Sequence, residues 1–164
     1  MRAAWTVRPK GERDVPAVVA LLADVAREGG FIATEWPFDV EEKERAMRDA
    51  LLERRALGWI ALAGRTVVGD LSVFDLELEE PELGMIVDAA YRGRGIGRGL
   101  IDAAVAWARA NERPAVRLRV FPENERARAF YLMNGFVELE VQRAAVVQRG
   151  GVRRDAILMR RELT

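Results

Sequence analysis

The feature that most constrains this chain is a glycine-rich segment, RGRGIGRG, which runs from Arg92 to Gly99. Glycine at this density weakens any helix or strand that contains it. An apolar stretch, ELGMIVD (residues 82–88), precedes the segment, and residues 96–111 follow with the apolar spacing of a helix. The chain must therefore place a strand, a turn of bare backbone and a helix in succession.

Such a junction is suited to binding an anion. The N–H groups of the first helical turn lack partners within the helix, and the helix dipole favours negative charge there. Glycine lets an anion approach the backbone closely, and Arg92, Arg94 and Arg98 can add charge-assisted hydrogen bonds. We expect a phosphate-bearing ligand at this junction, with pyrophosphate the natural group.

Three glycine-loop patterns can be compared with this segment. The dinucleotide pattern G-x-G-x-x-G fails because Arg98 or Leu100 stands where its third glycine should be. The P-loop pattern fails because no lysine lies near the segment. The pattern R-x-x-G-x-G is met by Arg92, Gly95 and Gly97, and a glycine-rich surface turn without a ligand is the structural alternative.

The remaining patterns predict one α/β domain over residues 1–164 with a mixed sheet. Strands are expected at residues 5–9, 58–64, 66–76, 82–88, 115–121, 136–147 and 153–163, and helices follow Asp14, Asp39, Gly95 and Asn124. The predicted hairpins make antiparallel pairs. The strand–helix–strand passage over residues 82–121 implies one parallel pair with a right-handed crossover.

Composition excludes several kinds of chemistry. The chain has no cysteine and no histidine, so thiol nucleophiles, disulfides and histidine-based triads or metal sites are ruled out, and we expect no metal. Lysine plus arginine equals aspartate plus glutamate at 26 each, which argues against a nucleic-acid partner. No apolar leader or membrane-length run is evident, so we expect a soluble cytoplasmic protein without a membrane partner.

Two motifs together resemble those of the GNAT superfamily of N-acyltransferases. R-x-x-G-x-G resembles its acyl-CoA pyrophosphate loop, and NERARAFYLMNGF (residues 124–136) is similar to its N…A…FYxxxGF signature. The resemblance covers nearly the whole chain. It implies a mostly antiparallel sheet of about seven strands with about four helices and a splayed parallel pair at the cofactor site. A homodimer through the C-terminal strands is a further expectation from the family.

The resemblance also implies where acetyl-CoA binds. Main-chain groups near Met85, Ile86 and Val87 would hold the pantetheine arm and polarise the thioester, while the loop amides would cradle the pyrophosphate. Asn124 would contact the pantetheine and Tyr131 the sulfur, although an N-cap and a core side chain are the respective structural alternatives. The full set of expected cofactor-binding residues is Met85, Ile86, Val87, Arg92, Gly93, Arg94, Gly95, Ile96, Gly97, Arg98, Asn124 and Tyr131.

The chemistry needs a proton acceptor for the substrate ammonium and a donor for the leaving thiolate. Glu82 is the first candidate base, because it begins the strand before the loop and resembles the strand glutamate that some family members use. Glu35 is the second, and Tyr131 is the candidate proton donor. Trp36, Phe38 and Phe31, in the same loop as Glu35, are candidates for lining the acceptor pocket; solvated carboxylates and simple aromatic packing are the alternatives for these positions.

These features predict an N-acetyltransferase that moves the acetyl group of acetyl-CoA directly to a primary amine in a ternary complex. The acceptor class stays open among a small molecule, an amino acid and a protein N-terminus. The alternative is an inactive acyl-CoA-binding sensor or scaffold; tight CoA binding without transfer to any amine would favour it.

Overall fold

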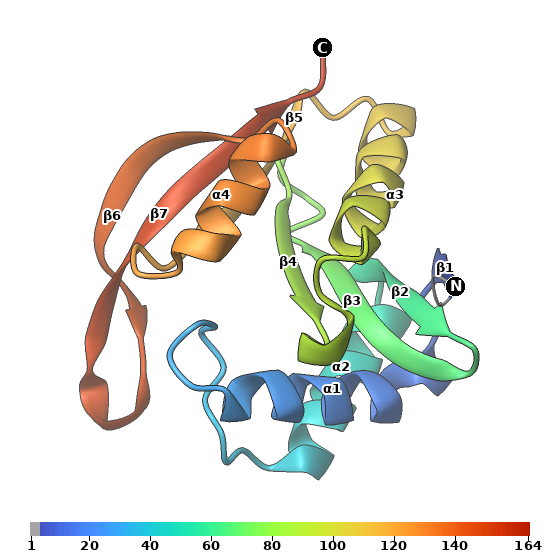
Figure 1. Cartoon of the computed structure of the whole chain (residues 1–164). Helices are drawn as coiled ribbons and strands as arrows, with labels where there is room; N and C mark the ends of the chain where they lie inside the picture. The colour runs from blue at the N-terminus through green and yellow to red at the C-terminus, as the bar shows by residue number, and fades with distance from the viewer. Residues whose placement is uncertain (1–3) are drawn as a thin grey trace.

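The computed structural model describes residues 4–164, whose strands join in one twisted sheet flanked by helices (Figure 1). The element order is the one expected from the patterns. In chain order, the elements are β1 (Trp5–Pro9), α1 (Val15–Arg27), α2 (Val40–Leu52), β2 (Leu57–Ala63), β3 (Thr66–Phe74), β4 (Glu82–Val87), α3 (Ile96–Ala110), β5 (Ala115–Val120), α4 (Glu125–Met133), β6 (Val137–Val147) and β7 (Arg153–Glu162).

The sheet order is β1-β2-β3-β4-β5-β7-β6, and every neighbouring pair is antiparallel except β4–β5. The parallel pair meets only at Glu82 and Arg117, so the strands diverge beyond this point and leave a gap in the sheet. This arrangement confirms the predicted mixed sheet with a splayed parallel pair. The last hairpin inserts β7 beside β5 and leaves β6 at the sheet edge.

Two helical layers cover the sheet. A side chain at Gly69 of β3 would lie 3.0 Å from Ile96 and 3.1 Å from Leu100, so α3 packs closely on that face. Neighbouring strand residues point to opposite faces, so Asp70 and Ser72 face the other side, where α1 and α2 lie. In Figure 1 the loop between α1 and α2 approaches the tip of the β6–β7 hairpin. Among residues 4–164, no helix is long and apolar enough to cross a membrane.

Candidate active site

The gap between β4 and β5 exposes backbone groups of β4. The amide of Asp88 donates to the carbonyl of Val68 at 2.9 Å, which fixes the hydrogen-bonding alternation of the β3–β4 pair. Ile86 and Gly84 therefore bond to β3, whereas the N–H and C=O of Met85 point toward β5. Because β5 has already diverged there, the Met85 groups are free to meet a ligand. The sequence predicted backbone contacts to the cofactor from Met85, Ile86 and Val87. Ile86 is hydrogen-bonded to β3, and the Val87 carbonyl accepts from Arg92 at 3.1 Å. Among these three residues, only Met85 therefore has both its N–H and its C=O available.

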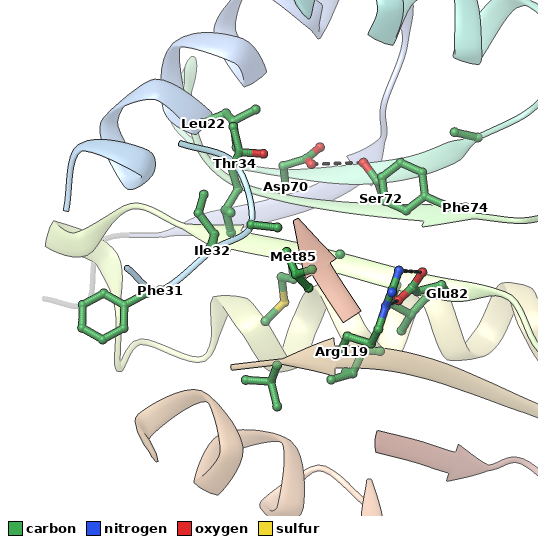
Figure 2. A pocket seen from close by; sticks show the side chains of 18 of the residues that line it. Leu22, Phe31, Ile32, Thr34, Asp70, Ser72, Phe74, Glu82, Met85 and Arg119 are labelled. Atoms are coloured by element: carbon green, nitrogen blue, oxygen red, sulfur yellow. Dashed lines mark hydrogen bonds and ion pairs between the residues drawn. The ribbon is translucent and has the colours of Figure 1, made fainter. Parts of the chain in front are cut away.

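A pocket of about 780 Å³ occupies this gap and continues beneath α1 and α2. Its walls come from β3, β4, β5, α4, the loop after α1 and the inner side of the β6–β7 hairpin. Figure 2 shows Asp70, Ser72 and Phe74 reaching the pocket from β3, with Glu82 and Met85 from β4 and Arg119 from β5. Gly84 and Met85, which are neighbours on opposite faces of β4, both line the pocket, so groups from both faces of the sheet border it.

The glycine loop lies past the end of β4, outside the lining of this pocket. Gly93 and Gly95 adopt left-handed conformations (φ 76° and 87°), which other residues rarely accept, and Gly95 is the N-cap of α3. The amides of Ile96, Gly97 and Arg98 form the first helical turn and have no acceptor within the helix. The residues present therefore fit a pyrophosphate, although Ile96 can offer only its backbone because its side chain is buried.

The loop arginines make different contacts. Arg92 donates two hydrogen bonds to Glu28 at the end of α1, at 2.6 and 2.7 Å, and holds the pKa of that carboxyl below its usual range. Arg94 stacks over the ring of Tyr91 at 4.9 Å, and Arg98 is exposed on α3. Arg92 thus braces the loop against α1, whereas Arg94 and Arg98 remain nearer to solvent.

Asn124 and Tyr131 both line the pocket. The side-chain oxygen Oδ1 of Asn124 accepts from the amide of Ala127 at 3.3 Å, so this residue caps α4, and its side-chain NH₂ group donates to the main-chain carbonyl of Phe31 at 3.4 Å. The Tyr131 ring packs edge-on against Phe130 and Phe136, and burial raises the pKa of its hydroxyl to about 12. At neutral pH Tyr131 is therefore a neutral hydrogen-bond donor.

Glu82 lines the pocket and forms an ion pair there with Arg119. Both of its carboxylate oxygens accept hydrogen bonds from Arg119 of β5, at 2.6 and 3.1 Å (Figure 2). The pair bridges the two strands where the gap begins. Each oxygen keeps a free lone pair, so Glu82 can still accept a hydrogen bond from a ligand.

The structure does not bring Glu35, Trp36 and Phe38 into the pocket. The Glu35 carboxylate accepts from the amide of Arg149 at 2.7 Å, which ties the loop to the β6–β7 hairpin. Trp36 packs against Phe38 and beneath the guanidinium of Arg27, on the outer side of α1. The part of the loop that lines the pocket lies just before these residues, at Phe31, Ile32, Ala33 and Thr34.

Sequence reasoning missed a buried polar cluster at the pocket floor. Lys10 donates to Asp70 at 2.6 Å and to Ser72 at 2.5 Å, and the Ser72 hydroxyl donates to Asp70 at 3.2 Å. All three residues line the pocket. The sequence did carry a sign of this cluster. In the apolar segment TVVGDLSVF, the polar residues Asp70 and Ser72 stand at alternate positions, which places both on one face of the strand.

Comparisons with known proteins agree with this geometry. A family model described as acetyltransferase (GNAT) family matches residues 19–136. An uncharacterised protein of Mycobacterium leprae is 35% identical over 157 residues, which cover 90% of this chain and 41% of that protein. The chain spans less than half the length of the curated relatives it matches.

Solved structures share the fold at lower identity. An N-acetyltransferase from Staphylococcus aureus matches with a TM-score of 0.84 and 16% identity, covering 98% of this chain and 99% of that one. A Salmonella typhimurium structure containing its cofactor acetyl-CoA matches with a TM-score of 0.80 and 18% identity, covering 98% and 95%. The family model, which spans most of the chain, identifies it as a member of the acetyltransferase (GNAT) family.

Proposed function

We propose that the chain transfers the acetyl group of acetyl-CoA directly to a primary amine, with both substrates bound at once. The observation that carries the proposal is the gap between β4 and β5, because it leaves the Met85 amide unpaired beside a pocket that reaches both faces of the sheet. The thioester enters from the face of α3 and α4, and the amine from the face of α1 and α2.

The chain's own groups supply the required chemistry. The amides at the start of α3 bind the pyrophosphate, and the Met85 amide donates to the thioester oxygen as negative charge develops on it. Glu82 accepts the proton of the incoming ammonium, directly or through water, and Tyr131 donates a hydrogen bond to the departing thiolate. The absence of cysteine leaves attack by the amine itself as the direct route.

Acetyl-CoA turnover tests this proposal. The protein is incubated with acetyl-CoA and a panel of primary amines, and the release of free CoA thiol is measured. We expect amine-dependent release above the hydrolysis seen without amine, and calorimetric binding of CoA. Absence of both would refute the proposal, whereas tight CoA binding without transfer to any amine would favour the sensor or scaffold alternative.

A matched pair of variants tests the role of Glu82. Glu82→Gln can keep one of the two hydrogen bonds from Arg119, through its amide oxygen, but removes the proton acceptor, so turnover should fall by roughly a hundredfold. Glu35→Gln changes a carboxylate that binds Arg149 outside the pocket and should leave turnover near the wild-type value. Equal turnover in both variants would remove Glu82 from the base role.

A further inference from the structure

The buried Lys10–Asp70–Ser72 cluster has a use beyond packing. The Lys10 side chain is 1% exposed and that of Asp70 is 9% exposed. Burial raises the pKa of Asp70, while the charge and hydrogen bond of Lys10 oppose this shift. A buried ion pair is often no more stabilising than apolar residues of similar size, so its presence at the floor of a pocket needs another reason.

A ligand in the pocket meets mainly acceptor groups at this cluster, because the third N–H of the Lys10 ammonium belongs to a side chain that is only 1% exposed. Ser72 has one O–H, which it donates to Asp70, and the enclosed Lys10 ammonium donates to Asp70 and Ser72. A carboxylate offers about four lone-pair positions, of which these contacts use two. A ligand that reaches Asp70 must therefore bring a donor such as an amine.

The cluster lies beside the proposed position of the thioester. Asp70 is paired with Ile86, and Ser72 with Gly84, so the two residues flank Met85 across the β3–β4 pair. Side chains of directly paired residues lie on the same face and are close neighbours. A side chain at Gly84 would lie 3.2 Å from the Phe74 ring, so glycine at this position leaves room for that ring, which also lines the pocket.

The walls above the floor are mostly apolar. Val18 and Leu22 of α1, Ile32 of the following loop and Met47 of α2 line this side (Leu22 and Ile32 are labelled in Figure 2). The other charged groups that line the pocket are the paired Glu82 and Arg119, together with Lys43, whose ammonium lies 5.5 Å from the ring centre of Phe38. A carboxylate held against Asp70 would meet a like charge.

We propose that the Lys10–Asp70–Ser72 cluster is the acceptor subsite, in which Asp70 accepts hydrogen bonds from the amino group and selects amines with an apolar body over free amino acids. Lys10 and Ser72 hold the carboxylate in position. This inference rests on the proposed function, because it names the acceptor class of that same site.

Calorimetry on the CoA-saturated protein tests the subsite with three probes of one size class, namely phenethylamine, phenylalanine and 3-phenylpropanoate. We expect phenethylamine to bind, phenylalanine to bind at least about tenfold more weakly, and 3-phenylpropanoate to show no binding. Stronger binding of phenylalanine or 3-phenylpropanoate would overturn the inference. Failure of CoA itself to bind would instead count against the proposed function.

Variants identify the residue responsible. Asp70→Asn should weaken phenethylamine binding by roughly tenfold to a hundredfold, with CoA affinity within about twofold of wild type. Glu77→Gln, which removes one negative charge from an exposed turn, is the matched control and should change neither. If Asp70→Asn does not fold, as judged by thermal unfolding, Lys10→Met combined with Asp70→Asn removes the unpaired charge and should show the same loss. Unchanged phenethylamine affinity in the folded variant would refute the assignment.

Discussion

At the scale of single residues, Tyr131 shows how burial defines a chemical role. Its pKa of about 12 lies above the value of about 8.5 that is typical of a free thiol, so complete proton transfer from Tyr131 to a thiolate is unfavourable. In the proposed reaction, the hydroxyl would instead stabilise the leaving group by donating a hydrogen bond. No hydrogen bond of this hydroxyl occurs among the described residues, which leaves it available for a ligand.

Tyr131→Phe removes this donor and should lower kcat by about tenfold to a hundredfold, with the KM for acetyl-CoA within about twofold of wild type. Steady-state kinetics measure both values. Tyr91→Phe alters the other tyrosine of the chain, beneath Arg94 and outside the pocket, and serves as the control. Because the pKa is raised, ionisation of Tyr131 should cause no fall in rate below about pH 11. An unchanged kcat would exclude Tyr131 from the chemical step.

At the scale of elements, the glycine segment serves two physical purposes. Gly93 and Gly95 turn the chain into α3 through left-handed conformations. Gly97 and Gly99 lie inside the helix, where added side chains would come within 2.8 Å of the Phe130 ring and 2.7 Å of the Trp5 ring. The second pair therefore lets α3 approach α4 and β1 closely.

Gly99→Ala tests this close approach. Alanine favours a helix by about 1 kcal/mol over glycine, but overpacking against the rigid Trp5 ring costs about 1–3 kcal/mol. We expect a net loss of about 1 kcal/mol in the free energy of unfolding, measured by denaturant titration. Adding Trp5→Phe should relieve the contact and give a non-additive recovery. A stabilised Gly99→Ala single variant would contradict the packing argument.

At the scale of the whole molecule, ion pairs connect separate segments, and two of the following three pairs join residues more than 60 positions apart. Arg8 binds Asp14, Arg92 binds Glu28, and Arg160 binds Glu80, and these hydrogen bonds hold the pKa of each carboxyl below its ordinary value. A lowered folded-state pKa contributes stability above the ordinary value, and this contribution is lost as the pH falls toward the folded value. Asp70 has the opposite sign, because burial raises its pKa.

The melting temperature should therefore fall as the pH is lowered from about 6 to about 3, since three carboxyls with lowered pKa outnumber Asp70. Thermal unfolding at a series of pH values measures this change. Glu28→Gln should flatten the curve below the ordinary glutamate value of 4.5, because it removes one of the three groups. A melting temperature that rises throughout this range would contradict the assignment of these pairs.

The homodimer stays a prediction at this scale. β6 lies at the edge of the sheet and exposes Val137, Leu139 and Val141, which is the location expected from the family resemblance. Measurement of the molar mass in solution is the direct test.

Predictions from local pattern succeeded for one helix cap and failed for another, and the role assigned to Glu35 failed because its partner is distant in the sequence. Asp39 caps α2 as expected, by accepting from the Glu42 amide at 3.0 Å. Asp14 was also expected to cap its helix, but its carboxylate binds the Gly11 amide and Arg8 instead. Glu35 was assigned to the acceptor site, yet its partner is the amide of Arg149, which no local pattern could identify.

The sequence by itself determined the order of the elements, the glycine turn before α3 and the exclusion of thiol and histidine chemistry. These features depend on hydrophobic periodicity, on the conformations open to glycine and on composition, all of which can be read from the sequence without knowing which distant residues meet. Only the tertiary structure decided that Lys10 meets Asp70 and that Arg92 pairs with Glu28. Such contacts depend on strand register and helix packing, which bring together residues 60 or more positions apart.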